Sequence, residues 1–181
     1  MYYKKILIIL LSFFLSLKCF SNLDYEKIGQ WDLNIDASTF GMTSNSTYTT
    51  YFPGGKIKVK NGEGDIKFCI EDATLLDATR MIFEIECYVK MDDNSVLFVE
   101  YNVKVTKDSS FDQKIGDGSK ITAPNNGLKY FFAEFKMKTT SEKYNWINDN
   151  IIIGKGLELR GSSKDDPPLG RAFYDLYIFK N

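Results

Sequence analysis

The stretch SVLFVEYNVKV, residues 95–105, decides the fold class of this chain. Every second residue in it is apolar, and these residues share one face: Leu97, Val99, Tyr101, Val103 and Val105. The residues between them are mostly polar. A period of two is typical of a β-strand that buries one face and exposes the other.

The same alternation recurs along the chain at residues 55–60, 65–71, 81–90, 128–138 and 171–179. In 81–90 it predicts an apolar face of Phe83, Ile85, Cys87 and Val89. In 65–71 it places Ile66, Phe68 and Ile70 on one face, with Cys69 and Glu71 opposite.

Turn residues separate these runs at 53–55, 61–64, 92–95 and 124–127, and the segment from Asp92 to Ser95 is typical of a hairpin. The one helix candidate is residues 141–148, with Ser141 as N-cap. Many strands with short turns and almost no helix predict an all-β domain, either a sandwich or a barrel.

The first 21 residues are typical of an export signal. Lys4 and Lys5 precede an apolar run over residues 6–17, which is too short to span a bilayer comfortably. Small residues at positions 19 and 21 predict cleavage after Ser21, which leaves residues 22–181 as the barrel domain. An uncleaved anchor is one alternative. A lipoprotein modified at Cys19 is another, although Lys18 fits such a signal poorly. We expect a periplasmic or secreted protein.

Charge and composition exclude several classes of function. Removal of the signal takes three lysines and no acid, which leaves 20 basic and 24 acidic residues and no basic run. This balance argues against nucleic acid and anionic membranes as partners, and no later segment is apolar enough to span a membrane. The chain has no histidine and no nucleotide-binding glycine loop, so we expect neither metal nor cofactor.

Two cysteines, Cys69 and Cys87, remain in the mature chain. An exported protein meets an oxidising compartment, where a disulfide between them is reasonable. Two buried free thiols on separate strands are the alternative, because the sequence does not give the distance between their Cα atoms.

A series of short motifs recurs in order between residues 47 and 181. They are Gly54-Gly55-Lys56-Ile57, Gly64-Asp65, Val89 to Asn94, Tyr130-Phe131 and, most specifically, Thr139, Tyr144, Trp146, Ile147 and Asn148 followed by Gly154-Lys155-Gly156. With these motifs the chain resembles the domain of unknown function 3237 family, a group of small bacterial and fungal β-barrel proteins. The resemblance implies a single antiparallel β-barrel, closed or nearly closed, and it implies no particular activity. Relatives often carry an arginine where this chain has Glu84 and Glu86, and another where it has Phe132.

The segment TTSEKYNWINDNIIIGKGLELRG, residues 139–161, interrupts the strand pattern. One interpretation makes Tyr144 and Trp146 the wall of a ligand cavity, with Asn148 as a polar contact. The other, which we favour, is structural: a helical turn near 141–148 covers one end of the barrel, and glycines relieve crowding in the next strand.

Three further residues are candidate ligand contacts: Tyr101, Glu134 and Asp175. An inward pair of carboxyl groups could act as acid and base. Alternation places Glu134 opposite the Phe131 face of its strand and Asp175 on the same side as Phe173. Solvated strand faces therefore explain the two acids more simply.

Three functions remain open. We expect an exported barrel that binds a small apolar or aromatic molecule without chemistry. The alternatives are a cofactor-free isomerase or cyclase, whose cavity holds a carboxylate and a tyrosine, and a filled barrel with a structural or host-interaction role. Cavity size separates the first two from the third, and a buried, paired carboxyl group would favour the enzyme. The sequence determines neither the ligand nor the oligomeric state.

Overall fold

The alternating stretches form long antiparallel strands in the structure, a computed structural model that describes residues 24–162 and 170–180. The expected signal at residues 1–21 lies outside the described residues. The strands are β1 (Tyr25–Ile35), β2 (Gly41–Met42), β3 (Thr47–Phe52), β4 (Gly54–Val59), β5 (Gly62–Leu75), β6 (Arg80–Met91), β7 (Val96–Lys107), β8 (Leu128–Thr139), β9 (Ile152–Arg160) and β10 (Gly170–Phe179).

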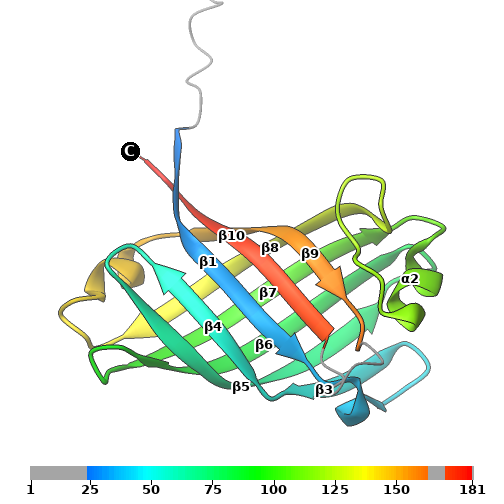
Figure 1. Cartoon of the computed structure of the whole chain (residues 1–181), viewed down its shortest axis with the longest axis horizontal. Coiled ribbons are helices and arrows are strands. Elements are labelled where there is room, and N and C mark those ends of the chain that lie inside the picture. Colours follow the sequence, from blue (N-terminus) through cyan, green and yellow to red (C-terminus); the bar gives the residue numbers. More distant parts are fainter. Residues whose placement is uncertain (1–23, 163–169, 181) are drawn as a thin grey trace, which may run out of the picture.

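The sheet closes on itself and forms the predicted antiparallel barrel (Figure 1). The strands from β5 to β10 follow one another around the barrel in chain order. The strand β1 then lies between β10 and β4, and β4 pairs with β5, which closes the ring. Both β3 and β4 pair with β5, one after the other, so residues 53–55 bend one strand and do not reverse the chain. When β3 and β4 are counted as one strand, the described residues form an eight-stranded barrel. Closure of the sheet leaves no long strand edge exposed.

Alternation placed the buried faces of β6, β7 and β8 correctly, because the apolar residues that it puts on one face of each strand are buried. On β10 the residues Ala172, Tyr174 and Leu176 are buried. The prediction for β5 is wrong beyond Ile66. A register shift between Ile66 and Phe68 inserts an extra residue, which turns Cys69 and Glu71 inward and leaves Phe68 and Ile70 on the outer surface.

Short helices cover the ends of the barrel. The predicted helical turn is a 3₁₀ helix, η2 (Asn145–Asp149), and Figure 1 shows it at the opposite end from α2 (Phe111–Asp117). Sequence analysis missed α2 and a second 3₁₀ turn, η1 (Ala37–Thr39). No helix within the described residues has the length and apolar character needed to cross a membrane.

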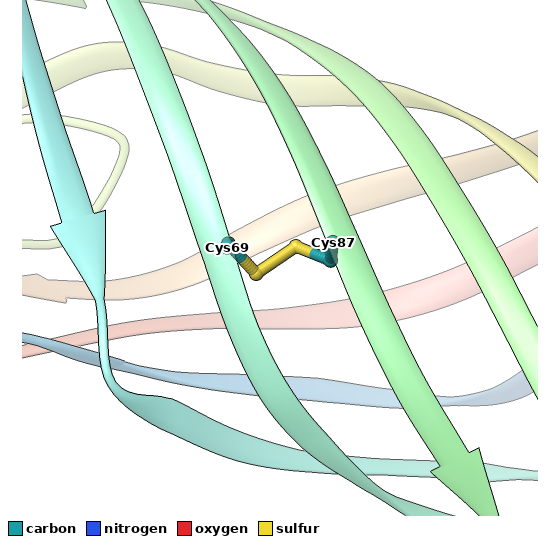
Figure 2. Close-up of a disulfide and its surroundings, with 2 residues drawn as sticks. All are labelled: Cys69 and Cys87. Carbon is teal, nitrogen blue, oxygen red and sulfur yellow. A yellow bond between two sulfur atoms is a disulfide. The ribbon is translucent and has the colours of Figure 1, made fainter.

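Cys69 on β5 and Cys87 on β6 form a disulfide (Figure 2). The two residues are direct partners in the ladder, their Cα atoms are 4.1 Å apart, and both side chains are buried. The bond therefore joins two neighbouring strands inside the barrel wall.

Candidate functional site

The barrel encloses a cavity of about 640 Å³ at the end that carries α2. Its wall is largely apolar, and the side chains that line it come from most strands of the barrel: Leu33, Ile35, Phe52, Leu75, Met81, Phe83, Ile85, Val103 and Ala172. The cavity reaches solvent, because Phe40 and Asp112 in its lining are exposed. Its size and composition are those of a pocket for a small organic molecule.

The carboxyl group of Glu71 is the most unusual polar group of this cavity. Glu71 lines the cavity and is only 7% exposed. Burial raises its pKa to about 8, the charge of Asp72 adds to the rise, and a hydrogen bond with Tyr48 opposes it. The carboxyl group is therefore mostly protonated at neutral pH.

Three tyrosines line the cavity with Glu71: Tyr48 on β3, Tyr101 on β7 and Tyr174 on β10. Burial raises the pKa of each hydroxyl, and the nearby Glu71 raises it further. These hydroxyls stay protonated at neutral pH, so the group of Glu71 and three tyrosines carries almost no net charge.

Tyr101 belongs to a buried aromatic cluster that lies behind the cavity wall. Tyr101 stacks on Phe135, with ring centroids 4.4 Å apart and planes 8° apart, and meets Trp31 edge-on at 5.6 Å. Neither the indole nitrogen of Trp31 nor the hydroxyl of Tyr101 has a hydrogen bond of acceptable geometry, although both atoms are buried. Of these two atoms, the Tyr101 hydroxyl belongs to a residue that lines the cavity.

The charged groups at the mouth are paired with one another. Lys107 forms an ion pair with Asp112 at 3.0 Å, and Arg160 forms one with Glu158 at 2.6 Å. Both cations belong to the lining and each has an anionic partner, although the buried Nε of Arg160 has no acceptor.

The structure places the candidates Tyr144, Trp146 and Asn148 away from this cavity, at the other end of the barrel (Figure 1). Tyr144 is fully buried and Trp146 is partly buried against the core. Asn148 is exposed and exchanges two hydrogen bonds with the backbone of Thr139, at 2.9 and 3.0 Å. These contacts are those of a cover over the barrel end.

The other three candidates, Tyr101, Glu134 and Asp175, also lie in different parts of the barrel. Tyr101 lies in the cavity, whereas Glu134 is exposed on the outer surface. Asp175 also points outward, where it accepts hydrogen bonds from Lys27 at 2.6 Å and Gln30 at 3.1 Å. Burial raises the pKa of Asp175, but these two partners outweigh burial and leave the pKa below its usual value. Of the six candidates, the structure brings only Tyr101 to the cavity.

A second hollow, of about 380 Å³, lies on the outer face of the barrel and is lined mainly by polar groups. Acidic residues face each other across the strands there, Asp72 opposite Glu84 and Glu86 opposite Glu100. Within the described residues no group of three or more potential ligands is arranged to hold a metal ion. The inner cavity is therefore the better candidate site, because its polar groups are desolvated.

Sequence analysis missed Glu71, Tyr48 and Tyr174 as site residues. The alternation of β5 placed Glu71 on the outer face, because a pattern with a period of two does not reveal the bulge between Ile66 and Phe68. One signal was present in the sequence: Cys87 was predicted to face inward, and a disulfide requires Cys69 on the same face of the sheet. With Cys69 inward, a period of two also turns Glu71 inward.

Comparison with known proteins agrees with this architecture. The sequence profile of the family described as "Protein of unknown function (DUF3237)" matches residues 25–177. No curated protein matches the sequence.

Three solved structures are similar in fold. A conserved protein of unknown function from Rhodopseudomonas palustris aligns with a TM-score of 0.71 at 15% identity, covering 88% of this chain and 99% of that chain. A beta-barrel like protein from Acinetobacter baumannii aligns with a TM-score of 0.63 at 16% identity, covering 89% and 99%. An enzyme from Penicillium herquei aligns with a TM-score of 0.55 at 14% identity, covering 87% and 95%. At these identities the likeness concerns the fold alone.

Proposed function

This chain belongs to the DUF3237 family, and from that premise we propose that it is an exported barrel protein that binds a small, largely apolar molecule in its inner cavity. The observation that carries the proposal is the cavity of about 640 Å³, which has apolar walls and a few buried polar groups. A volume of this order accommodates an organic ligand of two or three rings. A filled structural barrel is less well supported, because filling would leave no such space.

Binding can be tested with N-phenyl-1-naphthylamine, a neutral aromatic probe whose fluorescence rises in apolar surroundings. We expect saturable binding of one molecule per chain. Ala172→Phe places a ring in the cavity, which Ala172 lines, and is expected to abolish the signal. Asn102→Phe adds the same ring on the exposed outer face of β7 and serves as the control. Absence of binding, or equal binding to the Ala172→Phe variant, would contradict the proposal.

A cofactor-free isomerase or cyclase is the second candidate, and Glu71 is the observation that favours it. A carboxyl group with a pKa of about 8 can donate a proton at neutral pH and can also take one back. Glu71 shares the cavity with Tyr48 and Tyr101, the combination of carboxyl group and tyrosine that such chemistry requires.

The two candidates differ in an exchange experiment. In D₂O with 2-tetralone as a test ketone, an enzyme of this kind is expected to accelerate exchange of the hydrogens next to the carbonyl group. Glu71→Gln should abolish the acceleration and leave probe binding intact. Equal exchange rates for the wild type and the variant would reject Glu71 as the acid and base.

Export is also part of the proposal. It rests on the basic and apolar character of residues 1–21, and a disulfide is compatible with an oxidising compartment. We expect the mature chain to begin at Asn22, which N-terminal sequencing of exported protein can test. A lipid adduct on Cys19 would contradict this cleavage.

A further inference from the structure

The deep end of the cavity offers a hydrogen-bond donor without an acceptor, the hydroxyl of Tyr101. Tyr101, which packs against Trp31, lines the cavity and is only 2% exposed, yet its hydroxyl proton has no acceptor. A buried polar group without a partner is costly, and native proteins avoid it unless a ligand or an ordered water supplies the bond. The two residues are in contact, with ring centroids 5.6 Å apart.

Glu71 adds a second donor to the same end of the cavity. Its electrostatic influence reaches Tyr101, Tyr174 and Tyr48, which places the carboxyl group among the three tyrosines. Tyr48 hydrogen-bonds to Glu71, and a protonated carboxyl group still has its own O–H to donate. The donors of Glu71 and Tyr101 together suit an oxygen that only accepts.

The charges of the described lining argue against an anionic ligand. Lys107 and Arg160 are the cations of the lining, and they are engaged by Asp112 and Glu158. A carboxylate or phosphate at the deep end would lie beside the apolar wall, and the charges of both lining cations are already offset by ion pairs. A neutral acceptor avoids this cost.

Resting on the binding function proposed above, we propose that the ligand is a neutral, largely apolar carbonyl compound whose oxygen accepts hydrogen bonds at Tyr101 and Glu71. Its apolar body lies along the aliphatic and aromatic wall formed by residues such as Phe83, Val103 and Ala172. The Trp31 ring lies against Tyr101, with ring centroids 5.6 Å apart, and helps to hold the tyrosine in place. Selection for a carbonyl group follows because a site built from donors rejects analogues that lack the acceptor.

The probe for this inference is 6-propionyl-2-(dimethylamino)naphthalene, a neutral aromatic ketone whose emission shifts to the red when its carbonyl oxygen accepts hydrogen bonds. Tyr101→Phe removes one hydroxyl and keeps the ring stacked on Phe135. We expect it to weaken binding of the ketone about five- to tenfold and to shift the bound emission to the blue. Glu71→Leu is expected to act in the same direction, and Glu71→Gln, which keeps a donor, to restore much of the affinity.

Two comparisons complete the experiment. N-phenyl-1-naphthylamine, which has no carbonyl group, should bind wild type and Tyr101→Phe equally, and Tyr144→Phe, at the other end of the barrel, should leave both probes unaffected. The inference is overturned if Tyr101→Phe leaves binding of the ketone unchanged, if it weakens both probes equally, or if the alcohol made by reducing the ketone binds as tightly as the ketone. In each of these cases binding of the naphthylamine probe to wild type still supports the proposed function. Failure of both probes to bind wild type overturns the function as well.

Discussion

The hydroxyl of Tyr144 donates a hydrogen bond of 2.6 Å to Oδ1 of Asp92. Tyr144 lies directly before η2, and Asp92 lies in the hairpin between β6 and β7, so the bond ties the cover of the barrel end to the wall. Lys143 reaches the same carboxylate oxygen at 2.7 Å. Gly62 leaves the room for this arrangement, because a Cβ at that position would lie 1.7 Å from the Tyr144 hydroxyl.

Tyr144→Phe is expected to lower the free energy of unfolding by about 1 kcal/mol, the usual net value of such a hydrogen bond. A urea titration measures the change. Asp92→Asn and the double variant complete a mutant cycle, and additive effects of the two substitutions would show that the bond contributes nothing.

The same contact predicts a dependence on pH. Hydrogen bonds from Lys143 and then from Tyr144 lower the pKa of Asp92 to about 2. A lowered pKa means that the contact stabilises the fold above the ordinary pKa of aspartate and is lost as the pH falls towards 2. Wild type should therefore lose more stability than Asp92→Asn between pH 4 and pH 2. Thermal unfolding measures these losses, and equal losses of stability in wild type and Asp92→Asn would contradict this role.

Gly156 is required because the ring of Phe131 lies against it. A Cβ at position 156 would approach Cδ1 of Phe131 to 1.9 Å, and no backbone turn is involved, since Gly156 lies within β9. Gly156→Ala is expected to cost roughly 2–3 kcal/mol through overpacking. Phe131→Leu in the same chain should recover part of the loss. Gly41→Ala, which meets open space, is the control and should change stability by less than about 0.5 kcal/mol.

Burial of Glu71 predicts that the stability of the fold depends on pH in the opposite direction to the contribution of Asp92. Its pKa is raised to about 8, so the folded chain holds a proton that the unfolded chain releases above pH 4.5. Stability is therefore lost as the pH rises from about 4.5 to about 8. The groups that face Glu71 are Tyr48, Tyr101 and Tyr174, with Asp72 beside it in the chain.

Glu71→Gln removes this titration and is expected to be more stable than wild type at pH 7 by roughly 2–3 kcal/mol. The difference should shrink towards zero at pH 4. Urea unfolding at several pH values measures it, with the exposed Glu84→Gln as control. A difference between wild type and Glu71→Gln that is the same at pH 4 and pH 8 would refute the assignment.

The disulfide closes a loop with a sequence separation of 18 residues. By restricting the unfolded chain it should contribute about 3 kcal/mol, so unfolding in the presence of a reductant should occur at a lower urea concentration. Alkylation after unfolding under non-reducing conditions should modify neither Cys69 nor Cys87. Two alkylated thiols in oxidised, folded protein would disprove the bond.

Local alternation was sufficient for much of the fold. The faces of β6, β7 and β8, the hairpin at residues 92–95 and the helical turn before β9 all follow from patterns that neighbouring residues create. The prediction for β5 failed where one extra residue enters the strand, between Ile66 and Phe68. The strand β1, which has a similar irregularity between Lys27 and Gly29, was not predicted at all. A bulge moves every later residue of the strand to the opposite face of the sheet, and the alternation of apolar and polar residues does not detect it.

The sequence by itself therefore determined an all-β chain, the buried faces of β6, β7 and β8 and the hairpin at residues 92–95. Only the tertiary structure decided that the sheet closes around a cavity and that Glu71 faces into it. Glu71 meets Tyr48, Tyr101 and Tyr174 across strands that are distant in the chain. The protonation of Glu71 depends on desolvation by all of these strands together, and no local pattern encodes that environment.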